Sequence, residues 1–391
     1  MNLLVIGMGS VGEVIALVAQ ERPWLERLIL ADYNLQRALE VYQKLGRPAH
    51  CSVAQVDASR LESIVQLARA HQADFLLNAV SCEYSNLIFD AAYQTHCGYM
   101  DLALNGVAET MGQYQFERAR QWEENGLLAV VGMGMDPGVV DVFAKYAYKH
   151  LFDEIDEIGI RDGSSLSVEG HPFAPTFSIY DVMEECTDPA VVWERERGWY
   201  RVEPFSQNEV FEFPEIGPME VVTVEHEEVV LIPRWIPCRK VTFKYSLGET
   251  FVRVMQTIKL LGLHSRQPVD VKGVKVAPID VLAALLPDPA RLGPLMQGKT
   301  CVGALVTGQK GGQPRRVFLY QIMDNQESMA RYGVQAVALQ TAIGPVIALE
   351  MIAQGIWKGP GVFGPEAFDP DPFLERMPAY DFPYRLLELP A

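Results

Sequence analysis

The chain opens with apolar runs that alternate with helical patterns. Leu3 to Ile6 are branched apolar residues, which predict a strand buried on both faces, and Leu28 to Ala31 predict a second. Between them, Val14 to Ala19 have the spacing of a helix. The alternation continues to residue 131, with strands expected at 51–57, 75–80, 98–102 and 127–131 and helices at 34–45, from 61, at 88–96 and at 114–125. Six strands alternating with helices predict a doubly wound parallel sheet.

The pattern changes after residue 131. Segment 132–140 is rich in glycine, and 141–152 returns to helical spacing. Beyond it we expect strands at 158–161, 219–224 and 239–245, helices at 251–261 and 278–286, and a hairpin joining 300–308 to 316–323. A long apolar helix pattern at 332–355 is interrupted at Gly344-Pro345 and has few local partners. We therefore expect this helix to pack back on the first domain.

A glycine turn follows the first strand. Gly7, Gly9 and Gly12 have the spacing G-x-G-x-x-G, in which the glycines permit a tight turn, close approach of a pyrophosphate, and close packing of the helix on the strand. Asp32 lies 20 residues beyond Gly12, at the end of the second strand. There it can accept hydrogen bonds from ribose hydroxyls and repel a 2′-phosphate, which favours NAD over NADP. The expected phosphate-binding turn comprises Gly7, Met8, Gly9, Ser10, Val11 and Gly12.

Two further strand ends are candidates for cofactor contacts. Asp57 ends the third strand, where it would lie beside the adenine, although an aspartate that caps the next helix explains it equally well. Asn78, Ala79 and Val80 end the fourth strand, and ligands of open α/β sheets bind outside such carboxyl ends. We therefore expect a Rossmann-type α/β domain over 1–135, completed by 331–391, and an α+β domain over 136–330 that binds substrate and makes a homodimer contact.

Composition narrows the class of protein. The formal charge of −17 over 391 residues argues against a nucleic-acid partner. We expect no apolar run to span a membrane and see no secretory signal, so we expect a cytoplasmic enzyme without a membrane partner. The six cysteines are scattered, and neither a disulfide framework nor a metal site is expected.

Several motifs resemble the saccharopine dehydrogenase family over essentially the whole chain. They are the glycine turn, Ala31-Asp32, Asn78-Ala79, Tyr99-Met100-Asp101, Gly134 to Gly138, Thr341 to Pro345, Gly361-Val362 and Pro365-Glu366. Within the family, residues 139–155, 281–292 and 369–378 are most similar to the branch that makes carboxylated polyamines. Two features differ from that branch: Asp32-Tyr33-Asn34, which favours NAD(H), and the insert 164–201, which is somewhat like lysine 6-dehydrogenase.

The resemblance implies a reaction. A diamine, putrescine or diaminopropane, would condense with aspartate semialdehyde, and NAD(P)H would reduce the resulting imine. The alternatives are a lysine 6-dehydrogenase or saccharopine-type reductase, and, from another class, a dinucleotide sensor without turnover. Because a protonated imine accepts hydride better, the site needs a carboxylate beside it and a proton donor.

Four residues are candidates for this chemistry. Asp136 lies in the glycine-rich loop, where it either stabilises the iminium or caps the helix that follows. Asp101 ends the fifth strand and is either a second such carboxylate or a turn residue. His226 is flanked by two glutamates, which would raise its pKa, but a solvated histidine at a strand end fits as well. Cys82 is either a proton donor or a buried small residue.

Three cations could hold substrate carboxylates. Arg239, Lys240 and Lys244 belong to one expected strand, and period two places the two lysines on the same face. The alternative is that all three cations are simply exposed on an edge strand.

Overall fold

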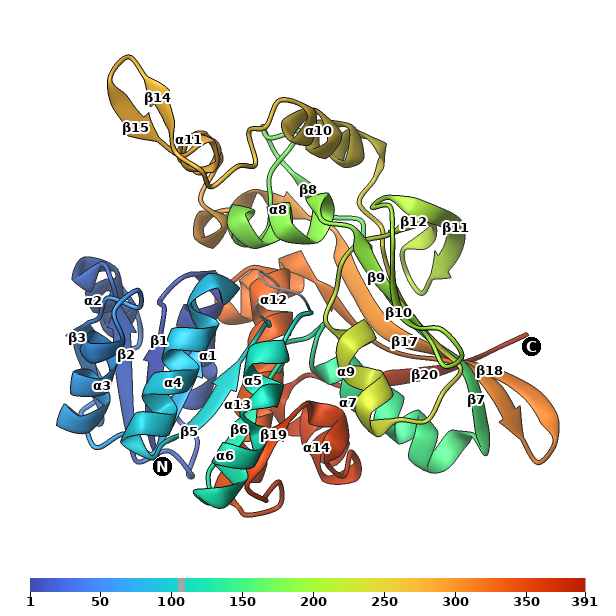
Figure 1. Cartoon of the computed structure of the whole chain (residues 1–391), viewed down its shortest axis with the longest axis horizontal. Coiled ribbons are helices and arrows are strands. Elements are labelled where there is room, and N and C mark those ends of the chain that lie inside the picture. The colour runs from blue at the N-terminus through green and yellow to red at the C-terminus, as the bar shows by residue number, and fades with distance from the viewer. Residues whose placement is uncertain (105–109, 391) are drawn as a thin grey trace. The chain divides into compact units, whose positions relative to one another are not determined.

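The computed structural model describes residues 1–104 and 110–390 (Figure 1). These residues form two compact units. The first unit contains residues 1–153, 230–237 and 338–385. The second contains 154–229, 238–337 and 386–391.

A parallel sheet of seven strands is the centre of the first unit. The strand order is β19-β6-β5-β4-β1-β2-β3, and each neighbouring pair is parallel. The strands are β1 (Asn2–Ile6), β2 (Arg27–Asp32), β3 (Cys51–Gln55), β4 (Phe75–Asn78), β5 (Gly98–Asp101), β6 (Leu128–Val130) and β19 (Gly361–Phe363). This topology confirms the predicted doubly wound fold.

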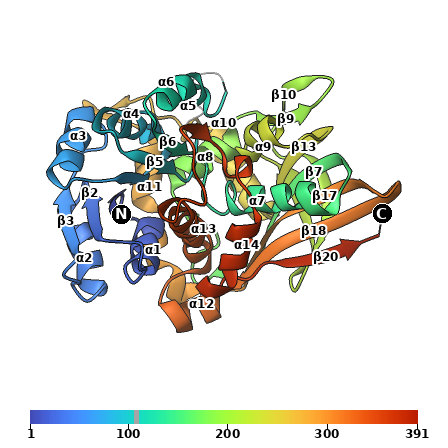
Figure 2. The ribbon, with the colours of Figure 1, turned by 90° about the horizontal axis from the view of Figure 1, so that it is seen from below.

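Helices cover both faces of this sheet. They are α1 (Ser10–Ala19), α2 (Leu35–Lys44), α3 (Leu61–Ala70), α4 (Ser85–Thr95), α5 (Gln113–Glu117) and α6 (Ala119–Glu124). Figure 2 shows α1 and α2 on one face and α3 and α4 on the other. The single helix expected at 114–125 is wrong in detail, because a break at Arg118 divides it into α5 and α6.

The C-terminal part of the chain completes this unit. It provides strand β19, which the sequence did not predict, together with α13 (Ala336–Ala353), α14 (Asp371–Arg376) and the short helices at Pro365–Ala367 and Met377–Tyr380. By length and composition α13 could cross a membrane, so the expectation that no apolar segment is long enough to do so is wrong. Most of α13 is nevertheless buried within the protein, as in the core helix of a globular fold.

A mixed sheet of nine strands forms the frame of the second unit. Its main path is β10-β9-β13-β7-β17-β18-β20, and the hairpin β11–β12 joins it through β13. The strands are β7 (Glu154–Ser164), β9 (Ala190–Glu194), β10 (Gly198–Val202), β11 (Ser206–Phe213), β12 (Gly217–Thr223), β13 (Lys240–Tyr245), β17 (Lys299–Lys310), β18 (Gln313–Asp324) and β20 (Arg385–Leu389). The predicted hairpin is confirmed as β17–β18, with Gly311 and Gly312 as its two loop residues, both at positive φ.

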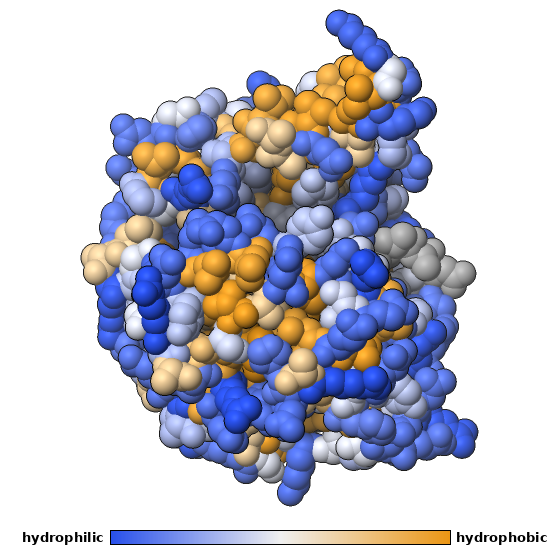
Figure 3. Space-filling view, turned by 90° about the vertical axis from the view of Figure 1, so that its left-hand side faces the viewer, coloured by the Kyte–Doolittle hydropathy of each residue, from blue (hydrophilic) through white to orange (hydrophobic). Residues whose placement is uncertain are grey.

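Helices and short strands surround this sheet. They are β8 (Ser167–Val168), α8 (Ile179–Thr187), α10 (Glu249–Leu260), β14 (Val269–Val271), β15 (Val274–Val276), α11 (Pro278–Leu285), β16 (Met296–Gln297) and α12 (Asn325–Tyr332). Hairpin β14–β15 forms a separate sheet and exposes Val269, Val271 and Val274. Apolar side chains gather beside this projecting hairpin at the top of Figure 3.

Candidate active site

The glycine turn after β1 has the form that a dinucleotide requires. Gly7 has a φ of +104°, and a Cβ there would lie 2.6 Å from the carbonyl oxygen of Ala79. A Cβ on Gly12 would lie 1.9 Å from the carbonyl oxygen of Gly7. Above Gly9, by contrast, a Cβ would find no described atom within 4 Å. This open space at the start of α1, where backbone N–H groups lack helical acceptors, fits a pyrophosphate.

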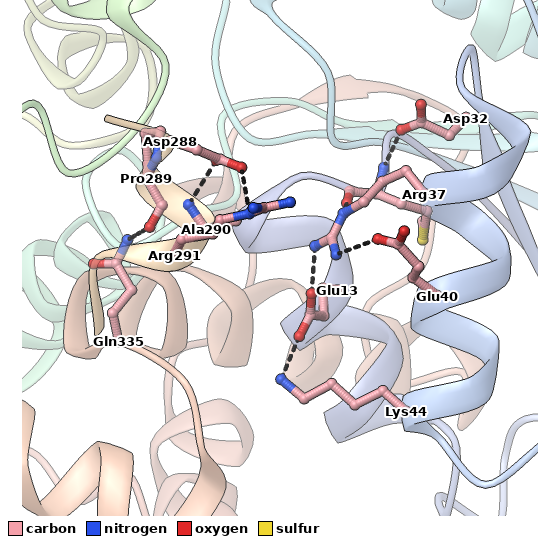
Figure 4. Close-up of polar contacts among 11 residues, drawn as sticks. Glu13, Asp32, Arg37, Glu40, Lys44, Asp288, Pro289, Ala290, Arg291 and Gln335 are labelled. Atoms are coloured by element: carbon pink, nitrogen blue, oxygen red, sulfur yellow. Dashed lines mark hydrogen bonds and ion pairs between the residues drawn. The ribbon is translucent and has the colours of Figure 1, made fainter. Parts of the chain in front are cut away.

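Asp32 connects the end of β2 to this turn. Its Oδ2 accepts a hydrogen bond from the Met8 amide at 2.7 Å, and its Oδ1 accepts one from the Asn34 amide at 2.8 Å. Arg37 of α2 donates from Nε to the Met8 carbonyl oxygen at 2.7 Å and pairs with Glu13 of α1 (Figure 4). The carboxylate is therefore oriented at the glycine turn, where a ribose would meet it.

The other predicted cofactor residues have local roles that the structure makes clear. Asp57 accepts hydrogen bonds from the amide and hydroxyl of Ser59, which lower its pKa, so it forms a turn before α3. Asn78 is buried and donates to the Ser85 hydroxyl at 2.9 Å. Ala79 and Val80 lie against Gly7, beside the phosphate-binding turn. A contact between any of them and the cofactor stays a prediction.

Asp101 is fully buried at the end of β5. It accepts hydrogen bonds from the Tyr99 hydroxyl at 2.8 Å and from the Gly132 amide at 2.7 Å. Burial, and next the charge of Asp101, raise the pKa of Tyr99 well above its ordinary value. The carboxylate thus fixes the loop that follows β6, which indicates a positioning role.

The glycine-rich loop leads into α7 (Val139–Tyr146) and a π-helical turn at Ala147–Leu151. The N-cap of α7 is Gly138, whose amide donates to the Asp141 carboxylate at 2.6 Å. The alternative in which Asp136 caps this helix is therefore wrong. Asp136 itself is only partly buried and precedes a cis proline.

Residues of α13, from the C-terminal part of the chain, pack against this glycine-rich loop. A Cβ on Gly344 of α13 would lie 2.7 Å from the Gly134 carbonyl oxygen, and the Thr341 methyl group approaches Gly134 as well. Cys82 is also buried in the first unit, at the start of a short 3₁₀ helix, Cys82–Tyr84.

His226 belongs to the second unit and is buried there. Its Nδ1 lies 2.6 Å from Oε2 of Glu228 and 3.4 Å from Oε2 of Glu227, and its ring stacks on Phe243 at 3.7 Å. This arrangement excludes the solvated strand end that was the alternative for this histidine. The donor atoms of His226, Glu227 and Glu228 lie within 4.8 Å of one another, a grouping suited to a cation.

The electrostatics of this cluster are unusual. Burial lowers the pKa of His226, but Glu228, Glu227 and Glu185 outweigh it and raise the pKa well above its ordinary value. Burial raises the pKa of Glu225 to about 7, although Arg201 pairs with it at 2.9 Å. Several carboxyl groups thus lie around one imidazolium.

One buried oxygen of the cluster lacks a partner. Glu228 is fully buried, and within the described part of the chain its Oε1 has no hydrogen-bond partner. Neither Glu228 nor Glu185 was predicted from the sequence to be a site residue. The run Glu225-His226-Glu227-Glu228 was a visible signal for the former, whereas Glu185, on α8, had none.

The three predicted substrate cations do not lie together. Lys240 and Lys244 line the same cavity, on one face of β13. Arg239 precedes the strand, is largely exposed and lies 3.4 Å from Asp156. Phe243, which contacts His226, points to the opposite face from the two lysines, because side chains alternate along a strand. The assignment of these cations to a substrate carboxylate stays a prediction.

A parallel sheet with this glycine turn and an acidic residue after its second strand defines a nicotinamide dinucleotide-binding protein. Comparison with known families agrees: residues 3–130 match the saccharopine dehydrogenase NADP binding domain, and residues 134–381 match the saccharopine dehydrogenase C-terminal domain. The chain belongs to the saccharopine dehydrogenase family, and it is an oxidoreductase that uses a nicotinamide dinucleotide. The predicted family membership and cofactor class are thereby confirmed.

The chain is also similar to individual proteins of known name and to solved structures. The chain is 32% identical to the carboxynorspermidine synthase of Vibrio alginolyticus, over 100% of this chain and 97% of that one. It is 29% identical to the carboxyaminopropylagmatine dehydrogenase of a Synechocystis species, over 98% and 96%. Among solved structures, saccharopine dehydrogenase (L-Glu forming) of Saccharomyces cerevisiae has a TM-score of 0.73 at 12% identity, covering 100% of both chains, which shows a shared fold.

Proposed function

We propose that this chain catalyses the reductive condensation of a diamine with aspartate semialdehyde to give a carboxylated polyamine. Putrescine and diaminopropane are the preferred amines. The proposal is supported by the names of relatives that match the chain over nearly its whole length. The observation that carries it is the buried acidic cluster around His226, because a diamine is a cation at neutral pH.

The cluster suits an ammonium group. Three carboxyl groups, of Glu185, Glu227 and Glu228, act on the charge of His226. Glu225 lies near Glu227 and pairs with Arg201. A buried carboxylate oxygen that accepts no hydrogen bond is costly, and a charged ligand that donates one removes that cost. The distal ammonium of a diamine would donate to Oε1 of Glu228, the oxygen that lacks a partner within the described residues.

His226 would hold the proton that the reaction needs. Its Nδ1 is held by Glu228, so Nε2 is the nitrogen left to exchange a proton with the carbinolamine oxygen, which leaves as water, or with the imine nitrogen. The raised pKa of His226 keeps the ring protonated at neutral pH. A bound NADH supplies the hydride that reduces the carbon–nitrogen double bond.

The decisive assay is product analysis. The purified chain is incubated with NADH or NADPH, aspartate semialdehyde, and diaminopropane, putrescine or agmatine, and the products are identified by mass spectrometry. A carboxylated polyamine, formed with equal consumption of the reduced cofactor, is the expected result. Oxidation of lysine by NAD, or formation of saccharopine, would instead favour the neighbouring branches. Cofactor binding without turnover on any of these pairs would favour a sensor.

Two variants connect the assay to the cluster. His226→Gln is expected to lower kcat at least tenfold and to leave the Kd of NADH unchanged. A matched control is His150→Gln, since His150 also pairs with a carboxylate, Asp371, at 2.7 Å, but on the surface. Equal activity of both variants would remove His226 from the mechanism.

A further inference from the structure

A polar cavity lies in the second unit, on the sheet face opposite Phe243. It has a volume of about 430 Å³, within the range of small-molecule sites. Four of its lining residues are cations: Arg161, Lys240, Lys244 and Arg316. Two carboxylates, of Glu157 and Glu209, leave a net charge of +2 in a chain whose total is −17. A cationic cavity in so acidic a protein is unexpected.

The sheet register places the cations at two levels. Lys240, Glu157, Thr307 and Arg316 form one row across β13, β7, β17 and β18. Lys244 and Arg161 pair four residues further along the same two strands. Three strand spacings separate the ends of the first row by about 14 Å between backbones, so the long side chains can reach a ligand of several atoms from both sides.

The inner pair of cations, Arg161 and Lys244, is held in place by hydrogen bonds. Glu209 accepts hydrogen bonds from Arg161 Nε and from Lys244 Nζ, each at 2.6 Å. The Arg161 guanidinium also donates to Thr242 Oγ1 at 3.4 Å and lies over Gly159, where a Cβ would come within 2.7 Å of Nη1. Both cations are nearly fully buried, which makes them a fixed, positively charged floor.

The outer pair of cations, Lys240 and Arg316, is available to bind a ligand. Lys240 approaches Glu157 only at 3.8 Å, and Glu157 already accepts a hydrogen bond from Thr242 at 2.9 Å. Within residues 1–104 and 110–390, the side chain of Arg316 forms no hydrogen bond or ion pair, although the residue is partly buried. A guanidinium in this setting suits a carboxylate or phosphate group.

We propose that this cavity binds a small multivalent oxyanion, a polycarboxylate or an organic phosphate, apart from the site that contains His226. Lys240 and Arg316 bind the outer anionic groups of the ligand, and Arg161 and Lys244 provide the charge beneath it. The amine and the oxyanion therefore bind on opposite faces of the same sheet, the amine at the acidic cluster and the oxyanion at the cationic one.

Calorimetric titration tests the proposal. Citrate and inorganic phosphate are titrated separately into the protein saturated with NADH, which blocks the dinucleotide site, at constant ionic strength in chloride. At least one probe is expected to bind, and the preferred probe distinguishes a carboxylate from a phosphate ligand. The double variant Lys240→Gln, Arg316→Gln should raise its Kd at least tenfold, with NADH binding retained as proof of folding.

The control variant is Arg315→Gln. Arg315 neighbours Arg316 on β18 but pairs with Glu388 of β20, and its substitution should leave anion binding unchanged. No binding by either probe, or equal binding by the double variant, would overturn the proposal. Two other results would overturn it as well. If neither probe binds but the double variant raises the KM for aspartate semialdehyde, the cations belong to the substrate site. If the double variant loses a dimer that the wild type forms, this face is an interface between subunits.

Discussion

Asp32 offers the sharpest test of how the first unit selects its cofactor. Its carboxylate accepts hydrogen bonds from the Met8 and Asn34 amides and lies where the ribose hydroxyls would bind. Replacing it with asparagine removes the negative charge and retains one acceptor oxygen. Asp32→Ala removes both acceptors, so it also releases the glycine turn at Met8.

The expected change in cofactor selectivity follows from two effects. Two charges of a 2′-phosphate about 5 Å from a carboxylate in a watery environment are repelled by about 2 kcal/mol. Hydrogen bonds from ribose hydroxyls to a charged acceptor contribute about 1.5–3 kcal/mol. Together they amount to about 4 kcal/mol, and we expect at least a tenfold fall in the ratio of the NADPH to the NADH dissociation constant for Asp32→Asn.

The assay is a calorimetric titration of each cofactor at constant salt. A matched control is Asp74→Asn, because Asp74 also accepts a hydrogen bond from a backbone amide, that of Asn2, at 2.7 Å, but at the amino ends of the strands. Asp32→Ala should additionally weaken NADH binding more than Asp32→Asn does. If the ratio is the same in the wild type and in Asp32→Asn, Asp32 does not select the cofactor.

Three further predictions concern the turn, the loop and the acidic cluster. Both Gly9→Ala and Gly12→Ala should raise the NADH Kd at least tenfold, but only Gly12→Ala should lower the Tm, since its Cβ meets the Gly7 oxygen at 1.9 Å; equal Tm changes would contradict this. Asp136→Asn should keep cofactor affinity and lower kcat at least tenfold in steady-state assays; a full rate would exclude it from the chemistry. Because the Glu225 pKa is about 7, this group becomes anionic as the pH rises, so diaminopropane should bind more tightly between pH 6 and 8 by titration, and Glu225→Gln should flatten that profile.

The sequence predicted the first unit well because its signals are local. Each of the six strands expected before residue 131 is present, since a buried run between helical patterns marks a strand directly. Strand β19 was missed because three residues carry no periodicity and its partner, β6, lies more than 200 residues earlier. The alternative in which Asp136 caps α7 was wrong, because the actual cap, a glycine at a φ of +132° whose amide donates to Asp141, leaves no simple sequence pattern.

The candidate site was only partly predictable, for a related reason. His226 was chosen for its acidic neighbours in the chain, and the structure adds Glu185 from α8, about 40 residues away, which no local pattern connects to it. The common face of Lys240 and Lys244 follows from period two. Whether the two lysines share the face of His226 or lie on the opposite face depends on the stacking of Phe243 on His226, a tertiary contact that sequence spacing does not encode.

The position of β19 has a consequence for biosynthesis. A ribosome must translate almost the entire second unit before residues 361–363 emerge to close the sheet beside β6. Until then, the newly made strands would present an unprotected edge to other nascent polypeptides. The first unit, although its first strand begins the sequence, can therefore be completed only near the end of translation.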